Sequence, residues 1–138
     1  MHVLIENVQV SKRAKEQLTK LKAWTGVQNW NVLCRWALCV SLGEKSVPPF
    51  ERIITDSSVQ MTWKVFAGPH QDLYIALLRE RCRRDDLGTD DETIITQFKL
   101  HLHRGVAYLA GDRRLREAGG MLNLVARQHG RLTAGSAG

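Results

Sequence analysis

The chain has 138 residues, of which 43% are hydrophobic, enough for one compact domain with its own core and too few for a second full domain. No stretch approaches the roughly 20 apolar residues of a membrane span, and the N-terminus lacks the pattern of a signal peptide, so we expect a cytoplasmic protein. The net charge of +6, from 20 Lys and Arg against 14 Asp and Glu, favours a polyanionic partner.

This basic excess lies at the two ends of the sequence. Residues 1–52 carry eight Lys or Arg against four Asp or Glu, and residues 111–138 carry five against two. The intervening residues 53–110 carry seven against eight. The excess of basic residues therefore does not come from the middle of the chain.

The first two predicted elements are a strand and a helix. Residues 2–10 are rich in β-forming residues and partly alternating, which predicts a short strand. Ser11 has the character of an N-cap, residues 12–25 follow the helical period, and Gly26 is a suitable end. The apolar positions of this helix fall on one narrow face: Ala14, Leu18, Leu21 and Thr25.

The rest of the circumference of this helix is cationic. Glu16 is its one acidic residue, and the cations are Lys12, Arg13, Lys15, Lys20 and Lys22. An ordinary solvated face is the alternative interpretation, but the scarcity of acidic neighbours argues against it. Lysine is a flexible point charge that suits neutralisation of phosphates more than bidentate reading of bases. We therefore predict that these five residues bind a nucleic-acid backbone.

A second helix is expected from Asn29 or Asn31 to Gly43. It is apolar nearly all round, and Arg35 is its one charge. Such a helix should be buried on more than one side, and in a domain of this size a partner chain would complete the cover.

The order strand, basic helix, apolar helix resembles the ribbon-helix-helix DNA-binding fold. In that fold two chains pair their strands and pack their second helices together. The strand here carries Glu6 and Asn7 but no Lys or Arg, so direct base reading by it is weak. A transcriptional repressor of this type is the alternative function.

Residues 50–66 predict a loop with extended segments, the best strand candidate being MTWKVF at 61–66. A helix is expected over 70–84, with a core supplied by Leu73, Ile75, Ala76, Leu77 and Leu78. The whole chain is thus expected to be mainly α-helical.

A capping box from Thr89 to Glu92 predicts the start of another helix. The buried face of this helix is expected to comprise Ile94, Ile95, Phe98 and Leu102. Gly105 predicts a bend or a break, and a last helical piece is expected over 112–118. We expect one domain over 1–130 and a disordered tail or expression remnant over 131–138.

No sequence pattern in the chain supports catalysis, so we expect no catalytic residue, no metal and no cofactor. His101 and His103 are two residues apart and fall on different faces of a helix, which disfavours a shared metal. Capping of a helix explains the acidic run Asp90–Glu92. The arginines at 79–84 are explained by their place at a helix C-terminus, where cations are favoured, although these arginines could also contact DNA. The third hypothesis is an enzyme that uses the carboxylates or the cysteines Cys34, Cys39 and Cys82. The odd number and the spacing of the cysteines, however, indicate reduced, buried thiols.

Four segments in succession, MTWKVFAG, DLYIALLRERC, DDET and HLHRGVAYLAG, resemble the DndE family of DNA phosphorothioation. The likeness covers about residues 1–118 and is most specific in HLHRGVAYLAG. The residues that carry it are Trp63, Lys64, Val65, Gly68, Leu73, Tyr74, Leu77, Leu78, Cys82, Asp91, Glu92, His103, Arg104, Gly105 and Leu109.

The resemblance implies an accessory subunit of the machinery that replaces a non-bridging phosphate oxygen of DNA by sulfur, working with the other components of that complex. It further implies a homotetramer that binds nicked double-stranded DNA through lysines. By position and charge, Lys12, Lys15, Lys20 and Lys22 are the matching candidates. The resemblance assigns no role to His103, Arg104 and Gly105, for which helix packing is the expectation.

Overall fold

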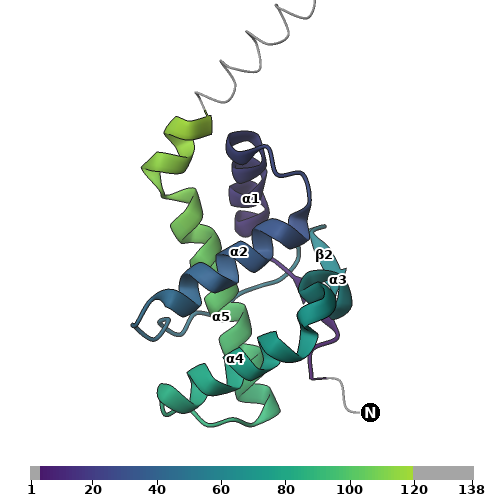
Figure 1. The fold of residues 1–138 in the computed structure, drawn as a ribbon, viewed down its shortest axis with the longest axis vertical. Coiled ribbons are helices and arrows are strands. Elements are labelled where there is room, and N and C mark those ends of the chain that lie inside the picture. Colours follow the sequence, from purple (N-terminus) through teal and green to yellow (C-terminus); the bar gives the residue numbers. More distant parts are fainter. Residues whose placement is uncertain (1–3, 120–138) are drawn as a thin grey trace, which may run out of the picture.

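Helices dominate residues 4–119, the part of the chain that the computed structural model describes (Figure 1). In chain order the elements are β1 (Asn7–Gln9), α1 (Lys12–Thr25), α2 (Trp30–Gly43), β2 (Gln60–Thr62), α3 (Trp63–Ala67), the 3₁₀ turn η1 (Gly68–His70), α4 (Gln71–Arg84) and α5 (Asp91–Ala110). Residues 113–119 are again helical. The expected mainly α fold, with an early strand, is confirmed.

The first two elements begin and end where local signals place them. The Ser11 hydroxyl accepts a hydrogen bond from the Ala14 N–H at 3.1 Å, and Gly26 ends α1 in the left-handed conformation, with φ of 74°. The strand is shorter than predicted and pairs antiparallel with β2 of the same chain, with Val8 opposite Met61. In the ribbon-helix-helix fold, by contrast, the corresponding strands of two chains pair.

Helix α2 lies across α5 and also packs against α3. Its buried positions are Leu33, Cys34, Ala37, Leu38 and Ser41. The chain itself therefore covers much of this apolar helix, and leaves one flank exposed at Val32, Trp36 and Cys39.

The strand predicted over 61–66 is wrong beyond Thr62. The Thr62 hydroxyl accepts the Val65 N–H at 3.1 Å and so starts helix α3. Trp63 and Phe66 both face the core and meet the ring of Phe98 edge-on, with centroids 5.5 and 5.4 Å apart. Burial of both aromatic rings on one side requires a helical turn, because neighbouring positions alternate between the two faces of a strand.

The core predicted for α4 is also partly wrong. Leu78 is buried and Ile75 partly so, but Leu73, Ala76 and Leu77 are exposed. The buried side of the helix runs instead through Leu78, Arg81 and Cys82. Since α4 packs mainly against α5 and α3, it has one covered side and cannot bury apolar residues on both.

Two predictions for α5 are corrected. Its N-cap is Asp90 and not Thr89, because the Asp90 carboxylate accepts both the N–H and the hydroxyl of Thr93, at 3.2 and 2.7 Å. The helix also continues through Gly105 without a break. A Cβ at this glycine would lie 3.0 Å from Ala37 Cα and closer still to the Ala37 carbonyl, so Gly105 allows α2 and α5 to touch.

After Gly111, residues 113–119 continue toward the end of α1 (Figure 1), which confirms the helical piece expected over 112–118 to within a residue. Leu115 packs against the core, and a Cβ at Gly119 would lie 2.6 Å from Trp24 Cα. The predicted tail at 131–138 lies outside the described residues. Within residues 4–119, no helix combines the length and the apolar character needed to cross a membrane.

Candidate nucleic-acid interface

The buried face of α1 determines where its charges point. Ala14, Leu18 and Leu21 are buried in the core, so the charged side chains on the rest of the helix face outward or toward its neighbours. Lys12, Arg13 and Lys20 are exposed, and Lys15 and Lys22 are half-buried. The predicted cationic surface of α1 is therefore present.

Three of the five predicted residues share one hollow. Lys12, Lys15 and Lys20 line a depression of about 590 Å³ between α1 and residues 56–58. The Lys15 ammonium donates a hydrogen bond to the Ser58 hydroxyl at 2.6 Å, and Lys12 Nζ lies 3.7 Å from an Asp56 carboxylate oxygen. With 76% and 46% of the two side chains exposed, this ion pair is weak and can open for a phosphate.

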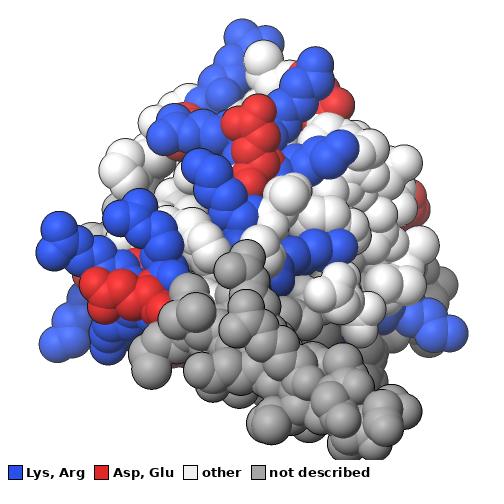
Figure 2. Space-filling model, turned by 90° about the horizontal axis from the view of Figure 1, so that it is seen from above, with Lys and Arg blue, Asp and Glu red and all other residues white. Residues whose placement is uncertain are grey.

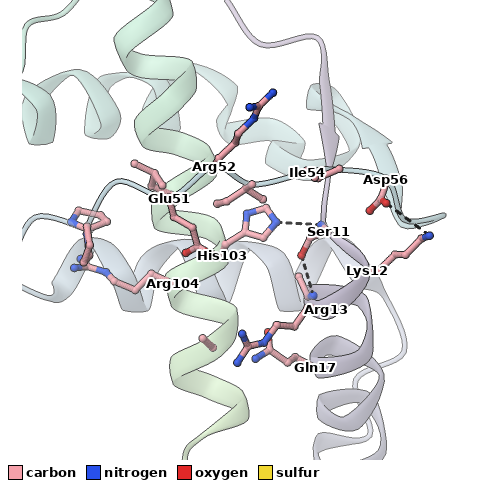
Figure 3. Close-up of a pocket in the computed structure, with 16 residues that line it drawn as sticks. Ser11, Lys12, Arg13, Gln17, Glu51, Arg52, Ile54, Asp56, His103 and Arg104 are labelled. Atoms are coloured by element: carbon pink, nitrogen blue, oxygen red, sulfur yellow. Dashed lines mark hydrogen bonds and ion pairs between the residues drawn. The ribbon is translucent and has the colours of Figure 1, made fainter.

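The other two predicted residues point elsewhere. Lys22 Nζ lies 3.6 Å from the centroid of the Trp30 ring, so a cation–π contact holds it against the first residue of α2. Arg13 lines a second depression, of about 520 Å³, between α1, α5 and the segment that precedes β2. Figure 3 shows Arg13 and Gln17 directed toward α5 across this cleft.

His103 lies at the base of the second cleft and joins α5 to the start of α1 (Figure 3). Its Nε2 accepts the Ser11 N–H at 3.1 Å, so its proton is on Nδ1, which donates to the Lys99 carbonyl at 2.8 Å. Burial lowers the pKa of His103 below its usual value. The ring is neutral and both of its nitrogens are hydrogen-bonded. His103 therefore holds α1 in place and has no nitrogen free for a ligand.

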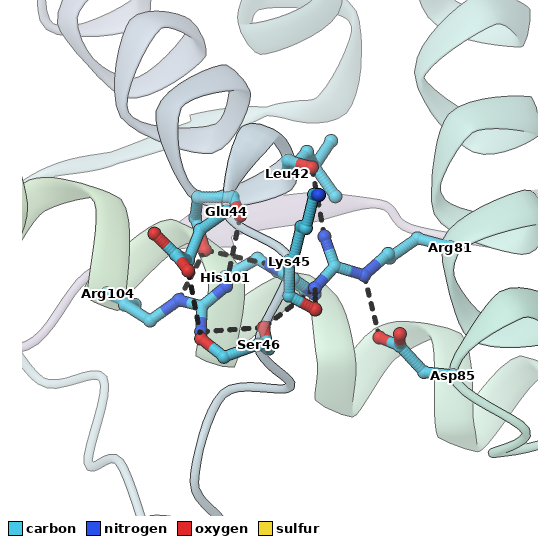
Figure 4. Close-up of polar contacts among 9 residues, drawn as sticks. Leu42, Glu44, Lys45, Ser46, Arg81, Asp85, His101 and Arg104 are labelled. Atoms are coloured by element: carbon cyan, nitrogen blue, oxygen red, sulfur yellow. Dashed lines mark hydrogen bonds and ion pairs between the residues drawn. The ribbon is translucent and has the colours of Figure 1, made fainter.

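Two arginines hold the segment that follows α2 (Figure 4). Arg104 donates from Nε to the Ser41 hydroxyl at 2.8 Å and from Nη1 to the Ser46 carbonyl at 2.9 Å. Arg81 donates to the carbonyls of Leu42 and Ser46, at 2.9 and 2.7 Å. The Leu42 carbonyl belongs to the last turn of α2 and has no partner within the helix, and the Ser46 carbonyl belongs to the segment beyond it. Both arginines are therefore structural.

Charges within this polar cluster are compensated or suppressed. The Arg81 Nε lies 2.7 Å from an Asp85 carboxylate oxygen, and both side chains are at least 90% buried. The buried His101 ring shares a hydrogen bond of 2.8 Å with the Ser41 hydroxyl. Burial, together with the charges of Arg81 and Arg104, lowers the pKa of His101 to about 4. His101 and His103 thus face different partners, as their spacing predicted.

The three candidate thiols lie in environments that raise their pKa values. Burial raises the pKa of the Cys34 thiol to about 12, and it also raises the pKa of Cys39 and Cys82. Cys39 is exposed, contrary to the expectation of three buried thiols. Among residues 4–119, no three His, Cys, Asp or Glu side chains come together as a metal site.

The sequence did not predict that Lys15 and Lys20 line one depression whereas Arg13 lines the other. It also missed that Arg81 and Arg104 hold backbone carbonyls. Arg104 also contacts Tyr108, four residues later on α5, with the guanidinium carbon 5.6 Å from the ring centroid. On α4, Arg81 lies on the same buried side as Leu78 and Cys82. A helical pattern that allowed a charged residue on the buried side would have indicated that Arg81 is structural.

Comparison with known proteins gives a consistent result. A family model described as DNA sulphur modification protein DndE matches residues 7–117. The structure of DndE from Escherichia coli B7A, involved in DNA phosphorothioation modification, is 20% identical, with a TM-score of 0.64 over 78% of this chain and 99% of that chain. A DndE glycine-to-lysine mutant is 17% identical, with a TM-score of 0.60 over 78% and 98%. No curated protein sequence matches the chain.

Proposed function

The chain belongs to the DndE family of DNA sulphur modification proteins, and we propose that it is a non-catalytic subunit that binds the phosphate backbone of double-stranded DNA for the phosphorothioation machinery. The observation that carries this proposal is the cationic surface of α1. Lys12, Lys15 and Lys20 line one hollow. The acidic side chains that also line it are Glu16 and Asp56, which leaves a net positive surface for phosphates.

The geometry favours backbone binding over sequence reading. The strand β1 is three residues long and is paired with β2. Its Gln9 side chain donates to the Ser57 carbonyl at 2.9 Å, and Asn7 is exposed. One exposed amide is little for base recognition in a groove, whereas lysines neutralise phosphates of any sequence. A repressor of the ribbon-helix-helix type therefore has less support.

The non-catalytic role is supported by the state of the thiols. A thiol with a raised pKa carries little thiolate at neutral pH, and the thiolate is the nucleophile. We therefore assign sulfur chemistry to the other components of the machinery. A variant with all three cysteines changed to alanine should leave phosphorothioate content in cells undiminished, whereas loss of modification by a folded variant would contradict this assignment.

We further propose that the protein works as a homo-oligomer in the cytoplasm, a tetramer by the family resemblance. Val32, Trp36 and Cys39 follow one another at i, i+4 and i+7, and form an exposed apolar stripe on α2. Association of such stripes buries them from water and multiplies the cationic surface. Sedimentation equilibrium should give about four times the chain mass, and a monomeric protein would refute the assembly.

DNA binding is tested by fluorescence anisotropy with labelled duplexes that are intact, nicked or single-stranded, over a salt series. For the triple variant K12Q/K15Q/K20Q we expect the log–log slope of affinity against salt to fall by up to about 2.7, at roughly 0.9 per phosphate contact. The wild type should bind nicked duplex most tightly.

The matched control removes three exposed cations from α3 and α4, K64Q/R79Q/R84Q. It has the same change in net charge and should bind like the wild type. Salt-insensitive binding by the wild type, or equal slopes for the α1 variant and the wild type, would refute the proposal.

A further inference from the structure

The helical segment 113–119 meets the end of α1 at one end of the molecule, and we propose that Arg113 and Arg116 extend the DNA-binding surface of α1. This inference rests on the function proposed above. Double-stranded DNA is the partner of both α1 and the segment 113–119.

On α1, one stripe of side chains faces α5 and its continuation. Arg13, Gln17, Lys20 and Trp24 are spaced at i, i+4, i+7 and i+11, so they lie along one side of the helix. Arg13 and Gln17 line the cleft that α1 forms with α5, and Trp24 meets Gly119. Lys20, which lies between Gln17 and Trp24 on the stripe, is exposed and also borders the hollow beside residues 56–58.

On the segment 113–119, a second stripe ends in the same contact. Arg116 neighbours both Arg113 and Gly119 on the surface of this helical segment, at a spacing of three residues from each. Gly119 packs so closely that a Cβ would lie 2.6 Å from Trp24 Cα and 2.8 Å from its Cβ. In Figure 1, α1 and this segment run side by side to the same end of the molecule. The two stripes therefore converge.

The charges of the second stripe are available. Arg113 and Arg116 are exposed, and within residues 4–119 neither of them forms an ion pair. Arg114 differs, because its guanidinium pairs with Asp112 at 3.1 Å. Figure 2 looks down on this end and shows Lys and Arg side chains spread across it, with acidic side chains between some of them.

The shape of this surface suits a duplex. Helices in contact lie roughly 8–10 Å apart, comparable to the roughly 12 Å width of the major groove, so cations on both helices can reach phosphates on both sides of a groove. The planar guanidinium of arginine can hold two phosphate oxygens in a fixed bidentate geometry, whereas lysine binds phosphate as a point charge. Lysines on α1 thus neutralise charge, and the arginines fix the position of the backbone.

The test compares the full-length double variant R113Q/R116Q with wild type by anisotropy on an intact labelled duplex. Each lost phosphate contact costs a factor of about 8 at 0.1 M salt and about 0.9 of the salt slope. We expect affinity to fall between about eightfold and about sixtyfold, and the slope by about 1–2. The charge-preserving variant R113K/R116K should keep the slope, which separates lost charge from a disturbed fold.

The matched control is R79Q/R84Q, which removes two exposed arginines from α4. If R113Q/R116Q binds like this control while K12Q/K15Q/K20Q is impaired, this inference is wrong and the proposed function stands. If all three variants bind like the wild type, both are wrong.

Discussion

Replacement of Gly105 by alanine should destabilise the protein by about 2–4 kcal/mol. The added methyl group would meet the backbone of Ala37, with Ala37 Cα at 3.0 Å and the carbonyl group nearer. A flexible side chain could move aside, but a carbonyl within α2 can move only with the helix. Overpacking of a core costs about 1–3 kcal/mol and more where the obstacle is rigid, and the better helix propensity of alanine returns up to about 1 kcal/mol.

The assay is thermal unfolding followed by circular dichroism. For a chain of this length each kcal/mol corresponds to about 2–5 °C, so the midpoint of G105A should fall by about 5–15 °C. The control is G43A in the last position of α2, where a Cβ meets no atom within 4 Å. It should leave the midpoint unchanged or raise it slightly. A G105A variant as stable as G43A would refute the close approach of α2 and α5.

Three further predictions concern Arg81, His101 and the cysteines. The variant R81M should lose about 3–5 kcal/mol of unfolding free energy in urea, since the buried Asp85 carboxylate and the carbonyls that Arg81 binds are left without their partner. The control R84M, at an exposed position, should lose less than about 0.5 kcal/mol. Equal losses would contradict the buried network. Because the pKa of His101 is lowered from 6.5 to about 4 in the folded state, protons bind the unfolded chain preferentially between these values. Stability should therefore be constant above pH 6.5 and fall, by on the order of 3 kcal/mol, as pH is lowered to 4, and an H101N variant with the same pH dependence would refute this. A thiol reagent should modify Cys39 slowly in the folded protein and the two buried thiols only after unfolding.

The elements that the sequence predicted best are those with local signals at both ends. Helix α1 has an N-cap at Ser11, a left-handed Gly26 and a buried stripe between them, and its bounds were predicted to the residue. Each of these signals acts over a single turn of backbone. No contact with another part of the chain is needed to place them.

Where the prediction was wrong, contacts between distant residues decided the structure. Residues 63–66 have strand-forming side chains, but burial of Trp63 and Phe66 against Phe98 requires a helix. Arginine is typically a surface residue, but Arg81 is buried where it binds the carbonyls of Leu42 and Ser46. Gly105 has the character of a helix breaker and instead permits two helices to touch. In each case the partner lies more than 15 residues away along the chain.

The candidate site shows the same division. The five basic residues of α1 could be listed from the sequence, because a helical wheel separates them from the core positions. Their grouping could not, since it depends on Asp56, Ser58 and Trp30, which neighbouring segments bring to α1. Arg113 and Arg116 could likewise be counted, but the place of the segment 113–119 beside α1 follows from the path of α5.

Helix α5 therefore determines the geometry of the proposed DNA-binding surface without supplying most of its charge. His103 binds the backbone at the start of α1, and Gly119, just beyond α5, contacts the end of α1 at Trp24. Gly105 sets the distance to α2. The segment that most specifically resembles the family thus holds the basic surface in place. The lysines that we expect to contact DNA are solvated side chains, whose function becomes apparent only once that arrangement is known.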